Sequence, residues 1–246
     1  MKAVIIGGTK GMGRALARKA AERGDRLFLL GRDDDDLARS AADLQVHDRE
    51  GRKVGHFVCD MERPESFEPA LDAADAALDG FDTLIVTAGM FATQDRLEED
   101  PELLGRLLTV NFTNTVLLCE AARKRLMARG GGTLCVFSSV AGDRGRKPVV
   151  LYGASKAGLS AYLEGLDHRY RAAGLRTICV KPGFVRTAMT QGLKPPPFAG
   201  EPEGVADRVL AAIDGGKPET YAPGMWRLVM MVIKSLPRFV MRRVGF

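Results

Sequence analysis

The N-terminal segment constrains the fold more than any other part of this sequence. A short apolar strand, Ala3–Ile6, runs directly into the glycine-rich turn Gly7–Gly13, and an Ala- and Leu-rich helix follows. This order places backbone N–H groups at a helix N-terminus, where an anion such as a pyrophosphate binds. Gly7 and Gly11 permit the turn and the close approach of the anion, and Gly13 allows tight helix–strand packing. The segment therefore predicts a dinucleotide-binding turn.

Further along the chain, apolar runs that indicate strands alternate with helical segments. No stretch rich in Pro, Gly and Ser divides the 246 residues, and the hydrophobic fraction of 46% is ample for a packed core. We therefore predict one α/β domain over residues 1–224 and a basic tail over residues 225–246. The strands expected after the first are Arg26–Leu30, Lys53–Cys59, Thr83–Val86, Thr133–Phe137, Leu175–Val180 and one near Thr220 and Tyr221.

The cysteines and the start of the chain bear on where the protein works. Cys59, Cys119, Cys135 and Cys179 all lie in apolar runs, and none forms a CxxC pair. We therefore expect buried free thiols in a reducing compartment and no metal site. The chain enters a strand at once, so we expect no signal peptide and a cytoplasmic protein.

One run in the second half of the chain has the pattern of a proton-transfer site. Tyr152 and Lys156 are four residues apart, so a helix would place both side chains on one face. A lysine ammonium beside a phenol favours the phenolate, and we expect it to lower the tyrosine pKa from its usual value of about 10. Ser139 ends an apolar, strand-like run, and a loop would bring its hydroxyl next to the phenol.

Together with the glycine turn, these residues resemble the short-chain dehydrogenase/reductase family. The resemblance is carried, in chain order, by GGTKGMG (7–13), TAG (87–89), Asn111, Ser139, YGASK (152–156) and PGFVRT (182–187). It implies a single Rossmann-type α/β domain, with a seven-stranded parallel sheet and helices on both faces, and a nicotinamide-dependent oxidoreductase. One departure is Thr87, where the family usually has Asn.

The resemblance also implies a catalytic set of Ser139, Tyr152, Lys156 and Asn111. Asn111 would kink its helix and hold a water in a proton relay to the lysine, and Ser138 would be structural. The cofactor-binding residues that it implies are Gly7, Thr9, Lys10, Gly11, Met12, Gly13, Arg32, Asp60, Met61, Ala88, Gly89, Tyr152, Lys156, Pro182, Gly183, Val185 and Thr187.

The residues after the second strand favour NADP(H) as the cofactor. An acid at that strand end would bind the ribose hydroxyls of NAD, whereas this chain has Gly31 followed by Arg32. Lys10 adds a second cation, and the two suit a 2′-phosphate. Asp33 could supply the acid instead, although the run Asp33–Asp36 is typical of a helix cap and first turn.

Two segments are expected near the substrate. The loop between Ser139 and Tyr152 contains Arg144, Arg146 and Lys147, which either receive a phosphate on the substrate or are simply solvated. Residues 188–204, with Pro195–Pro197, are expected to form a mobile lid.

The tail concentrates the charge of the chain. Its five basic residues, with no acid, equal the net charge of +5, so the rest is formally neutral and a spread surface for nucleic acid is not supported. If Met225–Leu236 is helical, Trp226, Met230 and Ile233 fall on one side. Such a helix is too short and too charged to span a bilayer, but it can lie on an anionic membrane surface. Alternatively, its apolar face packs on the same protein or on a second subunit.

These observations together predict an NADPH-dependent ketone reductase. The basic loop and the tail resemble those of family members that reduce a keto sugar carried on a polyprenyl phosphate, which would place the protein on the inner face of the membrane. Reduction of another amphiphilic ketone, such as a 3-keto lipid or a polyketide-like compound, is the alternative. A redox sensor that binds NADP without turnover is the non-enzyme alternative. The resemblance also implies a homodimer or homotetramer.

Overall fold

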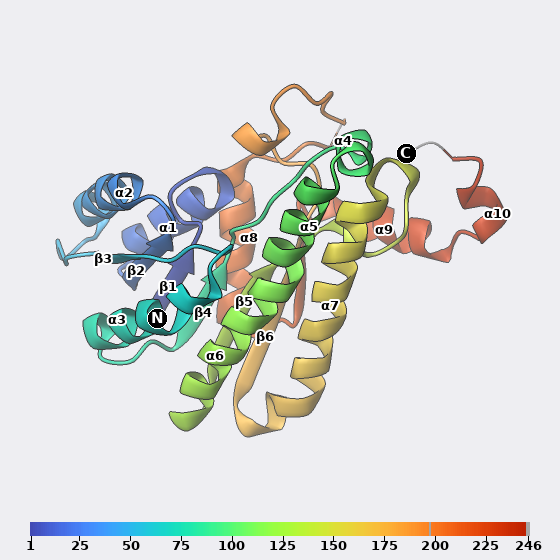
Figure 1. The fold of residues 1–246 in the computed structure, drawn as a ribbon. Helices are drawn as coiled ribbons and strands as arrows, with labels where there is room; N and C mark the ends of the chain where they lie inside the picture. The colour runs from blue at the N-terminus through green and yellow to red at the C-terminus, as the bar shows by residue number, and fades with distance from the viewer. Residues whose placement is uncertain (197, 245–246) are drawn as a thin grey trace.

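Seven strands, all parallel, form one sheet in the order β3-β2-β1-β4-β5-β6-β7 (Figure 1). The computed structural model describes residues 1–196 and 198–244, so Pro197 of the expected lid and Gly245 and Phe246 of the tail lie outside the described residues. The strands are β1 (Lys2–Ile6), β2 (Arg26–Gly31), β3 (Gly55–Val58), β4 (Thr83–Val86), β5 (Gly132–Phe137), β6 (Leu175–Pro182) and β7 (Glu219–Ala222). The predicted Rossmann-type α/β fold is confirmed.

Helices cover both faces of the sheet. The α-helices are α1 (Gly11–Arg23), α2 (Asp34–His47), α3 (Phe67–Leu78), α4 (Gln94–Glu99), α5 (Pro101–Leu108), α6 (Asn114–Ala128), α7 (Val150–Tyr170), α8 (Pro202–Asp214), α9 (Met225–Ser235) and α10 (Arg238–Met241). Buried side chains of α3, α6 and α7 pack on one face of the sheet, and those of α1, α2 and α8 pack on the other. Both faces of the central strands are therefore shielded from water, which explains why β1, β4 and β5 are mainly apolar runs.

Successive residues of a strand serve the two cores in turn. In β1, Val4 and Ile6 belong to the core under α3, α6 and α7, whereas Ala3 and Ile5 belong to the core under α1, α2 and α8. The four cysteines are buried and unpaired, as predicted.

Strand β3 is shorter than predicted, Gly55–Val58 instead of Lys53–Cys59. It lies at the edge of the sheet and pairs only with β2, where Phe28 aligns with Gly55 and Gly31 with Val58. An apolar run does not by itself show how many of its residues find a neighbouring strand.

The order of the strands determines where a ligand can bind. From β1 the chain winds outward through β2 to β3, then crosses back to β4 on the other side of β1. At such a switch point the loops diverge, and a crevice opens at the carboxyl ends of the strands. The glycine turn follows β1 and Thr87 follows β4, so both lie at this crevice.

The tail packs on its own domain through one face. Trp226, Met230 and Ile233 of α9 are buried with Val140 and Tyr221. This agrees with the alternative that the apolar face packs on the same protein. Pro237 separates α9 from α10, as its missing N–H would predict. Within residues 1–196 and 198–244, no helix combines the length and the apolarity that a membrane crossing requires.

Candidate active site

Apart from Tyr152 and Lys156, which lie on α7, the predicted cofactor residues leave the same edge of the sheet. They follow β1 (Gly7, Thr9, Lys10, Gly11, Met12, Gly13), β2 (Arg32), β3 (Asp60, Met61), β4 (Ala88, Gly89) or the end of β6 (Pro182, Gly183, Val185, Thr187). Because every strand is parallel, the carboxyl ends meet at this edge.

The glycine turn has the geometry that a dinucleotide cradle needs. Gly7 has φ +87° and Gly11 φ +54°, a region that favours glycine. A Cβ on Gly13 would lie 2.2 Å from the Gly7 carbonyl oxygen and 2.4 Å from Thr87 Oγ1. The N-cap residue of α1, Lys10, makes no side-chain capping hydrogen bond, so the first N–H groups of the helix are open to an anion. These residues fit a pyrophosphate.

Thr87 contacts the residue that precedes the glycine turn. Its hydroxyl donates to the Ile6 carbonyl oxygen at 2.9 Å, and the Ala88 N–H donates to the same oxygen at 3.2 Å. Thr87, which stands where the family usually has Asn, thus joins the ends of β4 and β1.

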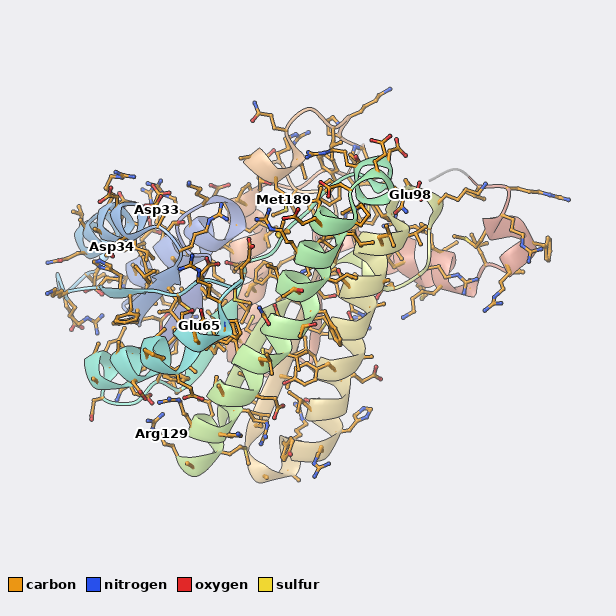
Figure 2. The ribbon with its side chains drawn as sticks, viewed as in Figure 1. Asp33, Asp34, Glu65, Glu98, Arg129 and Met189 are labelled. Carbon is orange, nitrogen blue, oxygen red and sulfur yellow. The ribbon has the colours of Figure 1, made fainter. Side chains whose placement is uncertain are left out.

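The residues expected beside the adenosine ribose have partners within α2. Asp33 caps this helix, because its side chain accepts a hydrogen bond from the Asp36 N–H at 2.9 Å; Figure 2 labels Asp33 and Asp34 at this end of α2. Lys10 Nζ lies 2.7 Å from Asp36 Oδ2. Arg32 is exposed. The predicted cap is therefore confirmed, and the Asp33 carboxylate is already used in it.

Asp60 and Met61 lie where the chain turns after β3. Asp60 Oδ1 accepts from the Glu62 N–H at 2.9 Å, and the Met61 carbonyl accepts from Asn114 Nδ2 at 2.7 Å. Met61 itself is buried in the core. These contacts fix the shape of this part of the crevice.

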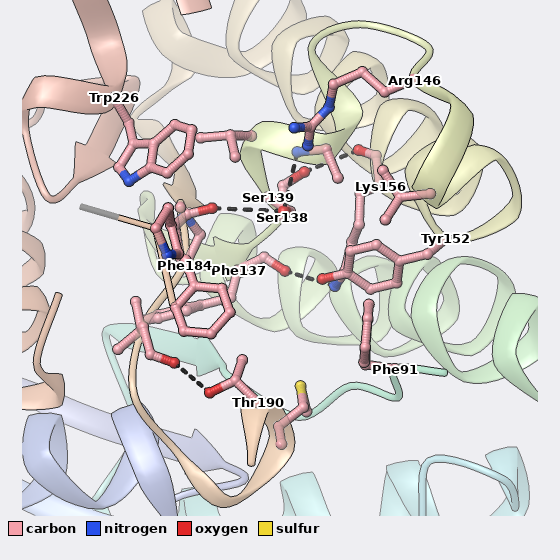
Figure 3. Close-up of a pocket in the computed structure, with 18 of the residues that line it drawn as sticks. Phe91, Phe137, Ser138, Ser139, Arg146, Tyr152, Lys156, Phe184, Thr190 and Trp226 are labelled. Carbon is pink, nitrogen blue, oxygen red and sulfur yellow. Dashed lines mark hydrogen bonds between the residues drawn. The ribbon is translucent and has the colours of Figure 1, made fainter. Parts of the chain in front are cut away.

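Ser139, Tyr152 and Lys156 line one pocket, as the sequence pattern predicted (Figure 3). Ser139 follows β5, and its Oγ accepts from the Ala141 N–H at 3.1 Å. Tyr152 and Lys156 lie one turn apart on α7, and the Lys156 Nζ donates to the Phe137 carbonyl oxygen at 2.9 Å. Ser138 donates to the Lys156 carbonyl oxygen at 2.9 Å, which is a structural role.

The expected effect of the lysine on the tyrosine pKa is wrong for this structure. Burial raises the pKa of Tyr152 to about 12, and the Ser139 hydroxyl opposes that rise. Burial also lowers the pKa of Lys156 to about 8. The Lys156 Nζ donates to the Phe137 carbonyl and lies 5.9 Å from the centroid of the tyrosine ring. The burial of the phenol therefore raises its pKa more than the lysine ammonium lowers it.

Asn111 interrupts the long helical region between Pro101 and Ala128. It is fully buried at the centre of a π-helical turn, Thr109–Thr113. Its Oδ1 accepts from the Met90 N–H at 2.7 Å, and its Nδ2 donates to the Met90 carbonyl at 2.9 Å. A Cβ on Gly89 would lie 3.2 Å from Asn111 Oδ1 and 3.5 Å from Lys156 Nζ, so the two groups are neighbours. The interruption is as predicted; the water relay stays a prediction.

The segment after β6 closes the crevice on its other side. Val185 is buried and pairs with Gly200. Thr187 caps a short helical turn, and a Cβ on Gly11 would lie 3.5 Å from Thr187 Cγ2. The loops after β1 and β6 therefore meet, and one ligand could contact both.

The pocket is a largely apolar cavity of about 840 Å³. Sequence reasoning missed the aromatic residues that join Tyr152 in its wall, Phe91, Phe137, Phe184, Phe198 and Trp226. The Phe91 ring stands edge-on to Tyr152 at 5.2 Å between centroids. Helix α9 and the residue after it contribute further apolar side chains, namely Val229, Val232, Ile233 and Leu236. The helical spacing of these residues was visible in the sequence, but it does not indicate which surface they face.

The three basic residues before Tyr152 have different surroundings. Arg144 Nη2 donates to the Leu236 carbonyl at 2.7 Å, behind α9. Lys147 is exposed and is not part of the cavity wall. Only Arg146 borders the cavity. The structure therefore separates residues that the sequence grouped together. In the described part of the chain, no cluster of three His, Cys, Asp or Glu side chains could hold a metal ion.

A dinucleotide cradle beside a Ser/Tyr/Lys constellation, at the carboxyl edge of a parallel sheet, defines a nicotinamide-dependent oxidoreductase. Comparison with known families agrees with this class. The short chain dehydrogenase family matches residues 1–197, and the chain belongs to that family. Its members act on a CH–OH or C=O group with NAD(H) or NADP(H).

The relatives are similar over most of their length. An oxidoreductase of Mycobacterium tuberculosis, described as uncharacterized, is 32% identical over 247 residues, 98% of this chain and 96% of its own. Carbonyl reductase family member 4 of Danio rerio is 29% identical over 86% of this chain and 90% of its own. A short-chain type dehydrogenase/reductase from Mycobacterium ulcerans has the same fold, with a TM-score of 0.81 at 20% identity over 89% of this chain and 86% of its own.

Proposed function

We propose that this protein is an NADPH-dependent reductase of an amphiphilic ketone. The observation that carries the proposal is the position of Ser139, Tyr152 and Lys156 in the wall of a large apolar cavity beside the dinucleotide cradle. The carbonyl reductase among the relatives supports this direction of chemistry.

The roles of the side chains follow from their protonation. NADPH, when bound, supplies a hydride to the carbonyl carbon. Tyr152, protonated because its pKa is about 12, donates its phenolic proton to the carbonyl oxygen, and the product is an alcohol. The Ser139 hydroxyl donates a hydrogen bond to that oxygen as negative charge develops on it. The Lys156 ammonium stabilises the phenolate left behind, and Asn111 positions Lys156 and the water that returns a proton.

The preference for NADP(H) rests on Lys10 and Arg32. Both lie at the end of the cradle where the adenosine ribose binds in this family, and Asp33, the acid that would favour NAD, is used as a helix cap. A 2′-phosphate would compete with Asp36 for Lys10. The exposed Arg32 would bind it without displacing a partner in the described residues.

For the substrate we propose a 2-keto sugar linked to a polyprenyl phosphate. The tail and the basic loop resemble those of decaprenylphosphoryl-2-keto-ribose reductase, and the apolar wall from α9 suits a lipid chain. The alternative is a 3-keto lipid or a polyketide-like ketone, which the same wall would accept. A redox sensor that binds NADP without turnover is the non-enzyme alternative, and the complete Ser/Tyr/Lys/Asn set argues against it.

We further propose a protein that works at the inner face of the membrane as a homodimer or homotetramer. The outward side of the tail exposes Leu228, Met231 and Phe239 beside its basic residues, which suits an anionic lipid surface. Exposed apolar side chains at the end of α5, in the turn Thr109–Thr113 and in α6, namely Leu108, Phe112 and Leu117, support self-association.

The test is NADPH oxidation with two substrates, a polyprenyl-phosphoryl 2-keto-pentose and a 3-keto lipid, each repeated with NADH. We expect turnover of the keto sugar with NADPH and much slower turnover with NADH. Turnover of the lipid alone would keep the reductase and replace the substrate. NADPH binding without turnover of any ketone would favour the sensor.

A further inference from the structure

Arg146 is a cation in the wall of the catalytic cavity that has no partner among the described residues. It makes no ion pair there, and its Nε is buried without a hydrogen-bond acceptor. Figure 3 shows its side chain on the same side of the pocket as Ser139. A buried guanidinium N–H without an acceptor is costly, so such a group in a cavity indicates a ligand that supplies the acceptor.

The acid nearest to Arg146 in the sequence already has partners of its own. Asp143, three residues earlier, binds Lys181 Nζ through Oδ1 at 2.8 Å and accepts from the Tyr221 hydroxyl through Oδ2 at 2.7 Å. These contacts tie the loop to β6 and β7. They leave Arg146 with only a distant attraction to Asp143, while burial lowers its pKa. The neighbouring cation, Arg144, is occupied by the Leu236 carbonyl.

The surroundings of Arg146 are otherwise apolar. Val149 precedes α7 beside it, and α9 contributes Val229, Val232 and Ile233 to the same cavity. Trp226, in the same wall, also has a buried Nε1 without an acceptor in the described residues. A ligand that fills this space must therefore combine an apolar body with hydrogen-bond acceptors.

We propose that Arg146 is the specificity-determining residue of the cavity and that it binds a phosphoryl group carried by the substrate next to its apolar chain. A guanidinium binds two phosphate oxygens at once, which fixes the orientation of the substrate as well as its affinity. The carbonyl is thereby directed toward Tyr152, and the chain lies against α9. This proposal rests on the proposed reductase function for its catalytic consequence, but not for the binding itself.

The binding can be measured without turnover, because Trp226 is the only tryptophan of the chain. Farnesyl phosphate and farnesol are titrated in the presence of NADP⁺, and the Trp226 fluorescence is followed. We expect the phosphate to bind the wild type roughly 10- to 100-fold more tightly than the alcohol, as a charge-assisted hydrogen-bond pair predicts. Arg146→Gln should lose that preference and bind farnesol as before, whereas Lys147→Gln, outside the cavity, should keep it.

Three outcomes would overturn the proposal. The first is equal affinity of the wild type for phosphate and alcohol. The second is a loss of affinity for both ligands in Arg146→Gln, which would mean a damaged cavity. The third is a weaker NADP⁺ affinity in Arg146→Gln, which would make the cofactor its partner. If phosphate binding follows the prediction while no phosphorylated ketone is reduced, the subsite stands and the proposed function fails.

Discussion

At the residue scale, two titratable groups of the site have pKa values that depend on burial more than on each other. The pKa of Tyr152 is raised to about 12 and that of Lys156 lowered to about 8, and in both cases burial is the largest cause. A protonated tyrosine suits a proton donor in ketone reduction. The lysine is the group whose charge changes near neutral pH.

The pH dependence of reduction should therefore report Lys156. Its pKa in the folded protein, about 8, lies below the usual value of about 10.4, so the ammonium is present below pH 8 and lost above it. We expect kcat/KM for NADPH to be constant below about pH 8 and to fall about tenfold per pH unit above it. A flat profile from about pH 6 to 10 would contradict this assignment.

The sequence predicted which residues would meet, but not their electrostatics. The spacing of Tyr152 and Lys156 follows from helix geometry, and the placement of Ser139 from the end of a parallel strand. The direction of the tyrosine pKa shift depends on burial and on the contact of Lys156 with the Phe137 carbonyl, which only the fold provides. The sequence grouped Arg146 with Arg144 and Lys147 as candidates for a substrate phosphate, and only the fold shows that Arg146 alone of the three borders the cavity. The place of Trp226 in the same wall likewise follows from the fold.

At the element scale, α9 connects the tail to the site. Trp226 and Ile233 of its inner face line the cavity, and the Arg144 hydrogen bond to the Leu236 carbonyl holds its C-terminal end. An amphipathic pattern predicted the inner face, Trp226, Met230 and Ile233. It could not identify what this face covers, because periodicity contains no information about the partner.

Removal of the Arg144 contact should loosen this end of α9. We expect Arg144→Ala to lower Tm by about 2–4 °C, as loss of about 1 kcal/mol predicts for a domain of this size. The Trp226 emission should shift to the red, because water reaches the indole more easily. Lys147→Ala is the matched control and should change neither. An unchanged Tm and spectrum in Arg144→Ala would show that the contact does not hold the helix.

At the scale of the whole molecule, the cavity lies between the sheet edge and the tail. Alternation of strands and helices was sufficient to predict the sheet and its covered faces. The place of α9 against the domain and of α10 beyond it was not predictable, since both depend on how the tail folds (Figure 1). The outward side of the tail carries exposed Arg238, Arg242 and Arg243.

This arrangement predicts binding to anionic vesicles. In cosedimentation, the protein should bind phosphatidylcholine vesicles that contain phosphatidylserine, and high salt should release it. Replacing Arg238, Arg242 and Arg243 by Gln should weaken binding roughly 100-fold, at about 1 kcal/mol for each cation. The matched control replaces three exposed cations from other helices and strands, Lys124, Arg169 and Arg176, and should bind as the wild type. An equal loss of vesicle binding in both variants would show that binding depends on the net charge of the protein and not on the tail.

The proton-donor role of Tyr152 is tested most directly by single-turnover reduction of a ketone with the variant Tyr152→Phe. This change removes one hydroxyl and keeps the ring that Phe91 contacts. We expect the rate to fall by at least about 100-fold, in the range that general acid catalysis contributes, while the affinity for NADPH stays within about twofold of the wild type. A rate close to that of the wild type would contradict the role of Tyr152 as the proton donor, and with it the proposed mechanism.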